Sequence, residues 1–146
     1  MSGYMKNWLK KWIILSILIS AIVSVGAFAS ARDECFAETA GWYKGNLIKP
    51  YSEIDPEKAS VVCESAVREN PDDLQMKALY CRALLRNDFL VLALEYCLSA
   101  ADQDVGAMNL LGYIYSSEYQ DVLESNTSFG WYERAANAGD SVGQYN

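Results

Sequence analysis

Apolar side chains recur every three or four residues along most of this chain, and turn-forming residues interrupt them at intervals. This spacing is typical of amphipathic helices that bury one face. The first helix is expected to run as far as Lys44, because Gly45 follows it. The pattern predicts helices at about 33–44, 56–69, 74–86, 89–101, 105–115 and 128–138. The short connections group them into predicted hairpins at 33–69, 73–101 and 105–138, followed by a partial helix at 141–146.

Capping residues mark the predicted ends of several helices. Asp55 is placed to cap the second helix, and Pro56 occupies the first helical position, where a missing N–H is tolerated. The same helix is expected to end before Pro71, because the residue before a proline avoids the helical region. Gly139 and Asp140 follow the helix at 128–138 in the way that helix C-termini prefer.

The beginning of the chain has a different pattern. Lys6, Lys10 and Lys11 precede an almost wholly apolar stretch at 12–25, and the small-residue triplets at 27–29 and 29–31 both fit a cleavage site. These are the three parts of a secretory signal peptide. We therefore predict a signal peptide at 1–31 and a mature repeat domain at 32–146. The alternative is an uncleaved membrane anchor, because a bilayer-spanning helix needs only about 20 apolar residues.

Two segments of the mature chain repeat a motif about 35 residues apart, at 96–101 and 131–136. Each has an aromatic-led pair, two variable residues and Ala-Ala. A spacing of 34 residues also separates Ala59 from Ala93, Cys63 from Cys97, and Ala78 from Gly112. A fixed period of this size is typical of stacked helical hairpins, which must pack on one another to bury their apolar faces. The residues expected to pack between helices are Ala59, Ala66, Ala78, Ala93, Ala100, Gly112, Tyr115, Ala135 and Ala136.

The third hairpin carries the most specific motif. It reads Leu111-Gly112-Tyr113-Ile114-Tyr115, then a loop, then Trp131-Tyr132-Glu133-Arg134-Ala135-Ala136-Asn137-Ala138-Gly139-Asp140. This order resembles the Sel-one-like repeat, a variant of the tetratricopeptide repeat. The match is best at 100–138, and 33–87 resembles the general tetratricopeptide pattern more loosely. The chain departs from the family pattern at 104–105, where glycine-aspartate is expected, and at 143–146, where the next leucine-glycine is absent.

The resemblance implies an all-α superhelix, an α-solenoid of helical hairpins with a concave surface. It implies a non-enzymatic adaptor or scaffold that binds a protein or peptide segment and needs no cofactor or metal. Bacterial relatives often work in the periplasm, so the periplasm is the expected location, with inner-membrane anchoring or secretion as alternatives. The alternative functions are an immunity or inhibitor protein for a toxin in the cell envelope, or a truncated repeat protein of no clear function.

Charge and composition narrow the function classes further. The mature part holds 19 acidic and 9 basic residues, a net charge of −10. Such a chain repels nucleic acid, which binds through Lys and Arg. We interpret the acidity as an aid to solubility, with a surface for a basic partner as the alternative. The chain has no histidine, which excludes nucleophile–histidine catalysis and histidine metal ligands. A hydrolase with paired carboxylates is a further alternative that spacing alone does not decide.

Four cysteines lie in the mature part, at Cys35, Cys63, Cys81 and Cys97. An even number in an exported chain predicts disulfides. Cys35 and Cys63 are about equally far from the loop near residue 50, and Cys81 and Cys97 evenly flank the turn near residue 89. Residues equidistant from a turn lie level in an antiparallel hairpin, which favours the pairs Cys35–Cys63 and Cys81–Cys97. The alternatives are Cys63–Cys81 with Cys35–Cys97, or buried free thiols. The chain has no Cys-x-x-Cys spacing, which argues against a metal or redox site.

Two aromatic pairs and a group of carboxylates are the remaining candidates. Trp42-Tyr43 and Trp131-Tyr132 could anchor a ligand, although packing between helices is the favoured interpretation. The carboxylates that could bind calcium are Asp102, Asp104, Glu118, Asp121 and Glu124. They lack the glycine and the regular spacing of a calcium loop, so we interpret them as solvated charge.

Overall fold

Helices make up most of the described chain, as the apolar periodicity predicts. The computed structural model describes residues 29–43, 46–116 and 128–145, and only the backbone at 42–43 and 46–47. The described part of the chain is therefore all-α, apart from one two-stranded ribbon. The helices of the described part are α2 (Ala31–Thr39), α3 (Pro56–Glu69), α4 (Leu74–Arg86), α5 (Leu90–Ala100), α6 (Val105–Ser116), α7 (Ser128–Asn137) and α8 (Ser141–Tyr145).

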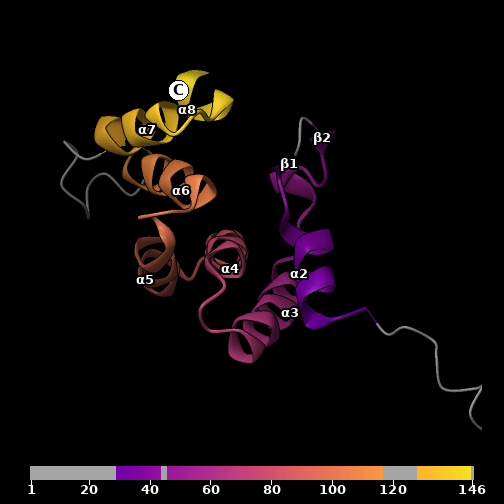
Figure 1. Ribbon diagram of the computed structural model, residues 1–146. Coiled ribbons are helices and arrows are strands. Elements are labelled where there is room, and N and C mark those ends of the chain that lie inside the picture. Colours follow the sequence, from indigo (N-terminus) through magenta and orange to yellow (C-terminus); the bar gives the residue numbers. More distant parts are fainter. Residues whose placement is uncertain (1–28, 44–45, 117–127, 146) are drawn as a thin grey trace, which may run out of the picture.

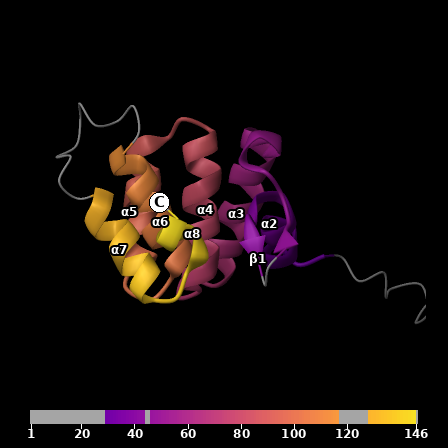
Figure 2. The same ribbon diagram turned by 90° about the horizontal axis from the view of Figure 1, so that it is seen from above.

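Consecutive helices pack in pairs, α2 with α3, α4 with α5, and α6 with α7. The pairs also contact one another, because α2 packs on α4, α4 packs on α6, and α7 packs on α8. Both views show the helices following one another across the molecule, from α2 and α3 at one end to α7 and α8 at the other (Figures 1 and 2). Helix α4 lies between the two ends and contacts α2, α3, α5 and α6.

The ends of the helices follow the capping signals of the sequence. The Asp55 carboxylate accepts a hydrogen bond from the backbone N–H of Lys58 (3.0 Å) at the start of α3, and α3 ends at Glu69. At the end of α7, Gly139 takes a positive φ of 89°, and the Asp140 N–H donates back to the Ala135 carbonyl (3.1 Å). These predicted helix ends are confirmed.

The first helix is shorter than predicted, and the expectation of a helix as far as Lys44 was wrong. Helix α2 ends at Thr39, and the chain continues into the antiparallel strands β1 (Trp42–Tyr43) and β2 (Asn46–Leu47). The Ile48 N–H donates to the Gly41 carbonyl (2.8 Å), which extends this ribbon beyond the strands. Aromatic residues favour extended backbone when a neighbouring strand is available to pair with them. A short 3-10 turn, η1 (Tyr51–Glu53), then leads to α3.

The core runs along the contacts between the pairs of helices. Its largest fully buried apolar side chains are Met76 and Leu84 of α4 and Leu111 and Ile114 of α6. Small residues fill the places where helices approach closely. Six of the predicted packing residues, Ala59, Ala66, Ala78, Ala93, Ala100 and Ala135, are at most 4% exposed. Gly112 is also buried, and Tyr115 and Ala136 are half-buried.

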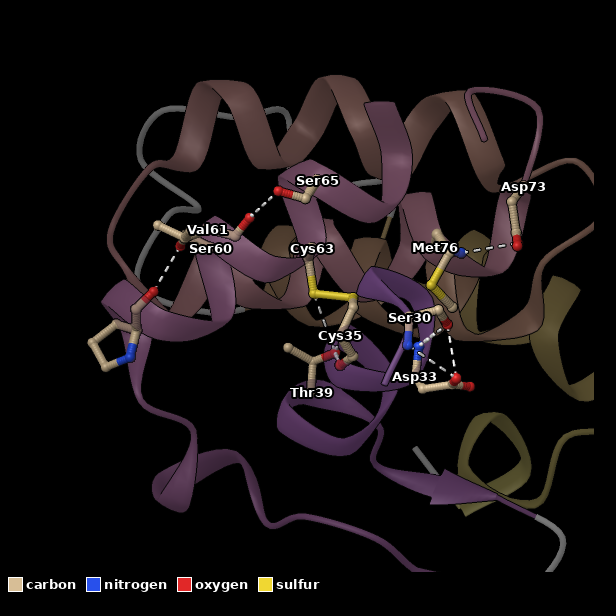
Figure 3. Close-up of a disulfide and its surroundings, with 11 residues drawn as sticks. Ser30, Asp33, Cys35, Thr39, Ser60, Val61, Cys63, Ser65, Asp73 and Met76 are labelled. Carbon is tan, nitrogen blue, oxygen red and sulfur yellow. Dashed lines mark hydrogen bonds between the residues drawn. A yellow bond between two sulfur atoms is a disulfide. The ribbon is translucent and has the colours of Figure 1, made fainter. Parts of the chain in front are cut away.

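Two disulfides each join the two helices of a pair. Cys35 of α2 is bonded to Cys63 of α3, and Cys81 of α4 to Cys97 of α5. Figure 3 shows the first of these bonds, beside which the Thr39 hydroxyl donates to the Cys35 carbonyl (2.5 Å). These are the pairs that the hairpin geometry favours. Two disulfides indicate an oxidising, exported environment.

The predicted signal peptide falls mostly on residues 1–28, which lie outside the described residues. The predicted boundary between residues 31 and 32 lies one residue inside α2, because that helix begins at Ala31 and is capped by Ser30. Within the described ranges, no helix combines the length and apolar character needed to cross a membrane.

Candidate binding groove

A groove of about 740 Å³ runs along the side of the molecule formed by the first helix of each pair. Side chains of α2, α4, α6 and α8 line it, together with the loop before β1, the turn η1 and Tyr132 of α7. In Figure 1, the ribbon β1–β2 stands on one side of α4, and α6 and α8 stand on the other. A groove of this size is within the range that holds small ligands or a few residues of an extended peptide.

Apolar side chains cover much of the groove wall. Phe36 of α2 stands near one end, Leu79 of α4 lies in the middle, and Leu110 of α6 and Val142 of α8 lie toward the other end. Leu79, Leu110 and Val142 are half-buried, so each keeps part of its surface accessible. A partner that covered this wall would gain the free energy of burying apolar surface, at about 25 cal/mol per Å².

Among the described residues that line the groove, Arg82 of α4 is the cation. Its Nη2 donates to the Lys49 carbonyl (3.3 Å), while its buried Nε has no hydrogen-bond partner. No carboxylate of the described residues forms an ion pair with it. Burial lowers the pKa of the Arg82 guanidinium. An arginine this well covered is normally paired, so its unused donors are unusual.

The Arg82 guanidinium is held in place by the backbone of Gly41 and by Tyr51. A Cβ at Gly41 would overlap Arg82 Nη1 and stand 3.1 Å from its Cζ. On another side, Cζ of Arg82 lies 5.7 Å from the centre of the Tyr51 ring, and Cζ of Arg86 lies 5.9 Å from it. The Tyr51 ring also contacts the ring of Tyr113, with the centres 6.3 Å apart. Tyr51 therefore links the end of α4 to α6 across the groove.

Two carboxylates of the described residues line the groove, and each accepts hydrogen bonds at the N-terminus of a helix. Asp104 Oδ1 accepts from the Ala107 N–H (2.8 Å) at the start of α6, and burial raises the pKa of Asp104. Asp140 Oδ2 accepts from the Gly143 N–H (2.9 Å) and from Asn109 Nδ2 (2.6 Å). The Oδ1 atom of Asn109 is buried without a partner. Neither carboxylate forms an ion pair with Arg82, because each accepts hydrogen bonds from backbone N–H groups at the start of a helix.

The carboxylates considered for calcium do not form a cluster in the described chain. Asp104 caps α6, whereas Asp102 is exposed and accepts from Arg134 Nη2 (3.4 Å). Glu118, Asp121 and Glu124 lie outside the described residues. Over the described ranges, no three Cys, Asp or Glu side chains stand close enough to share a metal ion.

The aromatic pairs have different surroundings. Trp131 and Tyr132 are half-buried, and Trp131 Nε1 is buried without a partner. The guanidinium of Arg134 lies over the Trp131 ring, 4.5 Å from its centre. Tyr132 packs on Gly112 and reaches the groove lining. The side chains of Trp42 and Tyr43 are not among those described.

Reasoning from the sequence did not single out Arg82, Tyr51, Asn109 or Leu79 as groove residues. A signal for some of them was present. The 34-residue offset that relates Ala78 to Gly112 also relates Gln75 to Asn109 and Leu79 to Tyr113, and all four of these last residues line the groove. Arg82 and Tyr51 carry no such signal, because each depends on where the loop between α2 and α3 lies.

Comparison with known proteins identifies no relative of this chain. No protein-family model, no curated protein and no solved structure matches the chain.

Proposed function

We propose that this chain is an exported, non-enzymatic interaction module whose groove binds a segment of another protein. The observation that carries the proposal is the groove itself. The first helices of successive pairs line it, it combines accessible apolar walls with polar groups that lack partners, and it spans the described domain from α2 to α8. Surfaces that bind protein segments combine apolar contact with a few polar groups that fix orientation.

The proposal includes membership of the Sel-one-like branch of tetratricopeptide-like repeats. Three features support it: the 34-residue period, the pairwise packing of consecutive helices, and the burial of the small residues that recur with that period. In such an array the first helices of each pair line one side, which is the side that holds the groove here. The same proposal assigns the molecule to the periplasm, on the basis of the N-terminal basic and apolar pattern and the two disulfides.

The test compares two exposed aromatic side chains, one that lines the groove and one that lies outside it. Tyr113 lines the groove and is 43% exposed, whereas Phe129 of α7 lies outside the groove lining and is 75% exposed. The wild-type chain, Tyr113→Ala and Phe129→Ala are each used to capture proteins from an envelope extract of the source organism. The proposal expects one protein that wild type and Phe129→Ala capture and that Tyr113→Ala loses.

Two results would contradict the proposal. One is that no protein is retained above the background of a blank resin. The other is that Tyr113→Ala retains the captured protein as well as Phe129→Ala does, because the contact would then lie away from the groove. Circular dichroism of both variants checks that each substitution leaves the fold intact.

A further inference from the structure

Arg82 lines the groove together with the carboxylates of Asp104 and Asp140, yet it pairs with neither of them. The chain carries 19 acidic and 12 basic residues, yet the cation that lines the groove is without a carboxylate partner among the described residues. Arg32, Arg68 and Arg134 each lie within ion-pair distance of an acidic side chain, whereas Arg82 and Arg86, which share the Tyr51 ring, have no such pair among the described residues. A partly buried guanidinium without a counter-ion is unfavourable unless something else satisfies its donors.

The guanidinium of Arg82 is also fixed in position before any ligand arrives. The Gly41 backbone covers one part of it, the Lys49 carbonyl takes one Nη2 proton, and the Tyr51 ring lies beside it. A planar fork held in this way presents its remaining N–H groups in a fixed direction. The acceptor that suits such a fork is a carboxylate, because two parallel N–H···O bonds can form.

The position of Arg82 along the groove indicates where that carboxylate would lie in a peptide. Groove-lining residues occur on both sides of α4: Phe36 on α2 in one direction, and Leu110 on α6 and Val142 on α8 in the other. A segment that crosses Arg82 can therefore continue in both directions and cover apolar wall on either side. This favours an acidic side chain inside the segment over a carboxylate at its end.

We propose that the groove recognises an extended peptide segment through one internal Asp or Glu side chain, which pairs with the Arg82 guanidinium, while apolar neighbours of that acidic residue lie on the wall formed by Leu79 and Leu110. This inference rests on the proposed function and names the chemistry of its partner. Arg86 supports the same site electrostatically, because its guanidinium lies on the same Tyr51 ring.

The test selects peptides without assuming a partner. The full chain, exported and purified without reductant, is used to pan a display library of random dodecapeptides, and sequences that also bind Tyr113→Ala are discarded. The retained sequences are made as acetylated and amidated peptides, so that neither end carries a charge. We expect them to share one Asp or Glu. Its change to Asn or Gln should raise Kd at least about 10-fold, because a charge-assisted hydrogen bond to the guanidinium is lost.

The protein variants show whether Arg82 is the partner of that acidic residue. In Arg82→Gln, the same change in the peptide should alter Kd by less than about 2-fold, because the interaction has already been removed. Arg68→Gln, which removes an exposed arginine of α3, is the charge-matched control and should behave as wild type. The Kd values of the altered peptides are first measured with wild-type protein. This part of the test therefore remains valid even if Arg82→Gln fails to fold.

The outcomes separate this inference from the proposed function. Peptides that bind in the groove without needing an acidic residue would overturn the inference and leave the proposed function standing. The inference would also be overturned if changing the peptide's Asp or Glu raised Kd as much with Arg82→Gln as with wild type. A requirement for a free C-terminal carboxylate in place of an acidic side chain would also overturn it. If no peptide binds in a way that Tyr113→Ala abolishes, the proposed function and the inference both fail.

Discussion

Gly112 of α6 lies against the ring of Tyr132 of α7 so closely that a Cβ added at Gly112 would stand 2.5 Å from Tyr132 Cε1 and 2.8 Å from Cζ. The ring sits over the backbone of α6, and the Ser128 hydroxyl donates to the Gly112 carbonyl (2.9 Å) beside it. The close approach of α6 and α7 therefore depends on the absence of a side chain at 112. This gives a physical reason for the glycine of the motif and for the second residue of the aromatic pair that follows it.

Gly112→Ala is expected to lower the free energy of unfolding by about 1–3 kcal/mol, the usual cost of overpacking a tight core. The higher helix propensity of alanine offsets part of this, by at most about 1 kcal/mol. Urea unfolding followed by far-ultraviolet circular dichroism measures the difference. Gly130→Ala in α7 is the matched control, because a Cβ there meets no atom within 4 Å. That control should be neutral or slightly stabilising, and equal losses in both variants would contradict the contact.

Each disulfide is expected to stabilise the domain separately. Replacing Cys81 and Cys97 together by Ala should lower the free energy of unfolding by about 3 kcal/mol, because the unfolded chain regains the freedom of a closed loop. The bond Cys35–Cys63 closes a longer loop, with a sequence separation of 28 against 16, so its removal should cost slightly more. Guanidinium unfolding of the two double variants measures both losses.

Peptide mapping of the non-reduced protein checks the pairing that this prediction assumes. Fragments that join Cys35 to Cys63 and Cys81 to Cys97 are expected. A fragment that joins Cys63 to Cys81 would contradict both the pairing and the separate contributions of the two loops. Four free thiols in protein taken from an oxidising compartment would contradict the disulfides altogether.

Much of the helical framework could be predicted from the sequence, because its signals are local. Asp55 and Pro56 define the start of α3 through one hydrogen bond and one fixed φ angle, and Gly139 ends α7 by adopting a φ angle that other residues avoid. The end of α2 could not be predicted in the same way. Trp42 fits a helical spacing, yet its backbone pairs with Leu47, and that pairing depends on a segment later in the chain.

The groove was less predictable than the core for a related reason. Core positions on α4 such as Ala78 and Leu85 repeat with the helical period, and they face other helices wherever these lie. Arg82 reaches its position through Gly41, Lys49 and Tyr51, which belong to a loop whose course no local pattern specifies. A charged residue on the edge of an apolar stripe is normally read as solvent-facing, so sequence patterns alone gave no reason to single it out.

Stability below neutral pH is expected to depend on Glu38. Its carboxylate accepts from Lys49 Nζ and from Lys58 Nζ, both at 2.5 Å. These hydrogen bonds, that of Lys49 first, lower the pKa of Glu38 from its ordinary value of 4.5. A lowered folded pKa means that the stabilisation is present above pH 4.5 and is lost as the pH falls through the folded pKa.

Thermal unfolding at a series of pH values from neutral to about pH 3 measures this loss. Glu38→Gln should lower the unfolding midpoint at neutral pH and flatten its fall in the acid range, because the variant has no carboxylate to protonate. Glu95→Gln, which alters an exposed carboxylate of α5 outside the ion pairs of the described residues, is the control. Identical acid profiles for wild type and Glu38→Gln would show that the two lysine contacts contribute nothing to the pH dependence.

The cap of α2 moves the expected cleavage site from after Ala31, the boundary predicted from the sequence, to after Ala29, so that the mature chain begins at Ser30. Ser30 caps α2: its hydroxyl accepts from the Asp33 N–H (3.2 Å), and its own N–H donates to Asp33 Oδ2 (3.4 Å). Cleavage after Ala29 keeps this reciprocal pair, whereas cleavage after Ala31 removes it together with the first residue of α2. Loss of such a cap costs about 1 kcal/mol.

The intact mass of the exported protein, with N-terminal sequencing, identifies the site. A chain that begins at Arg32 would contradict the prediction, and a chain that keeps residues 1–28 would contradict the signal peptide. The value of the cap is measured separately on the exported protein. Ser30→Ala should lower the free energy of unfolding by about 1 kcal/mol, while Ser30→Asp, which retains a side-chain acceptor, should remain close to wild type. If Ser30→Ala is as stable as wild type, the cap gives no reason to prefer cleavage after Ala29.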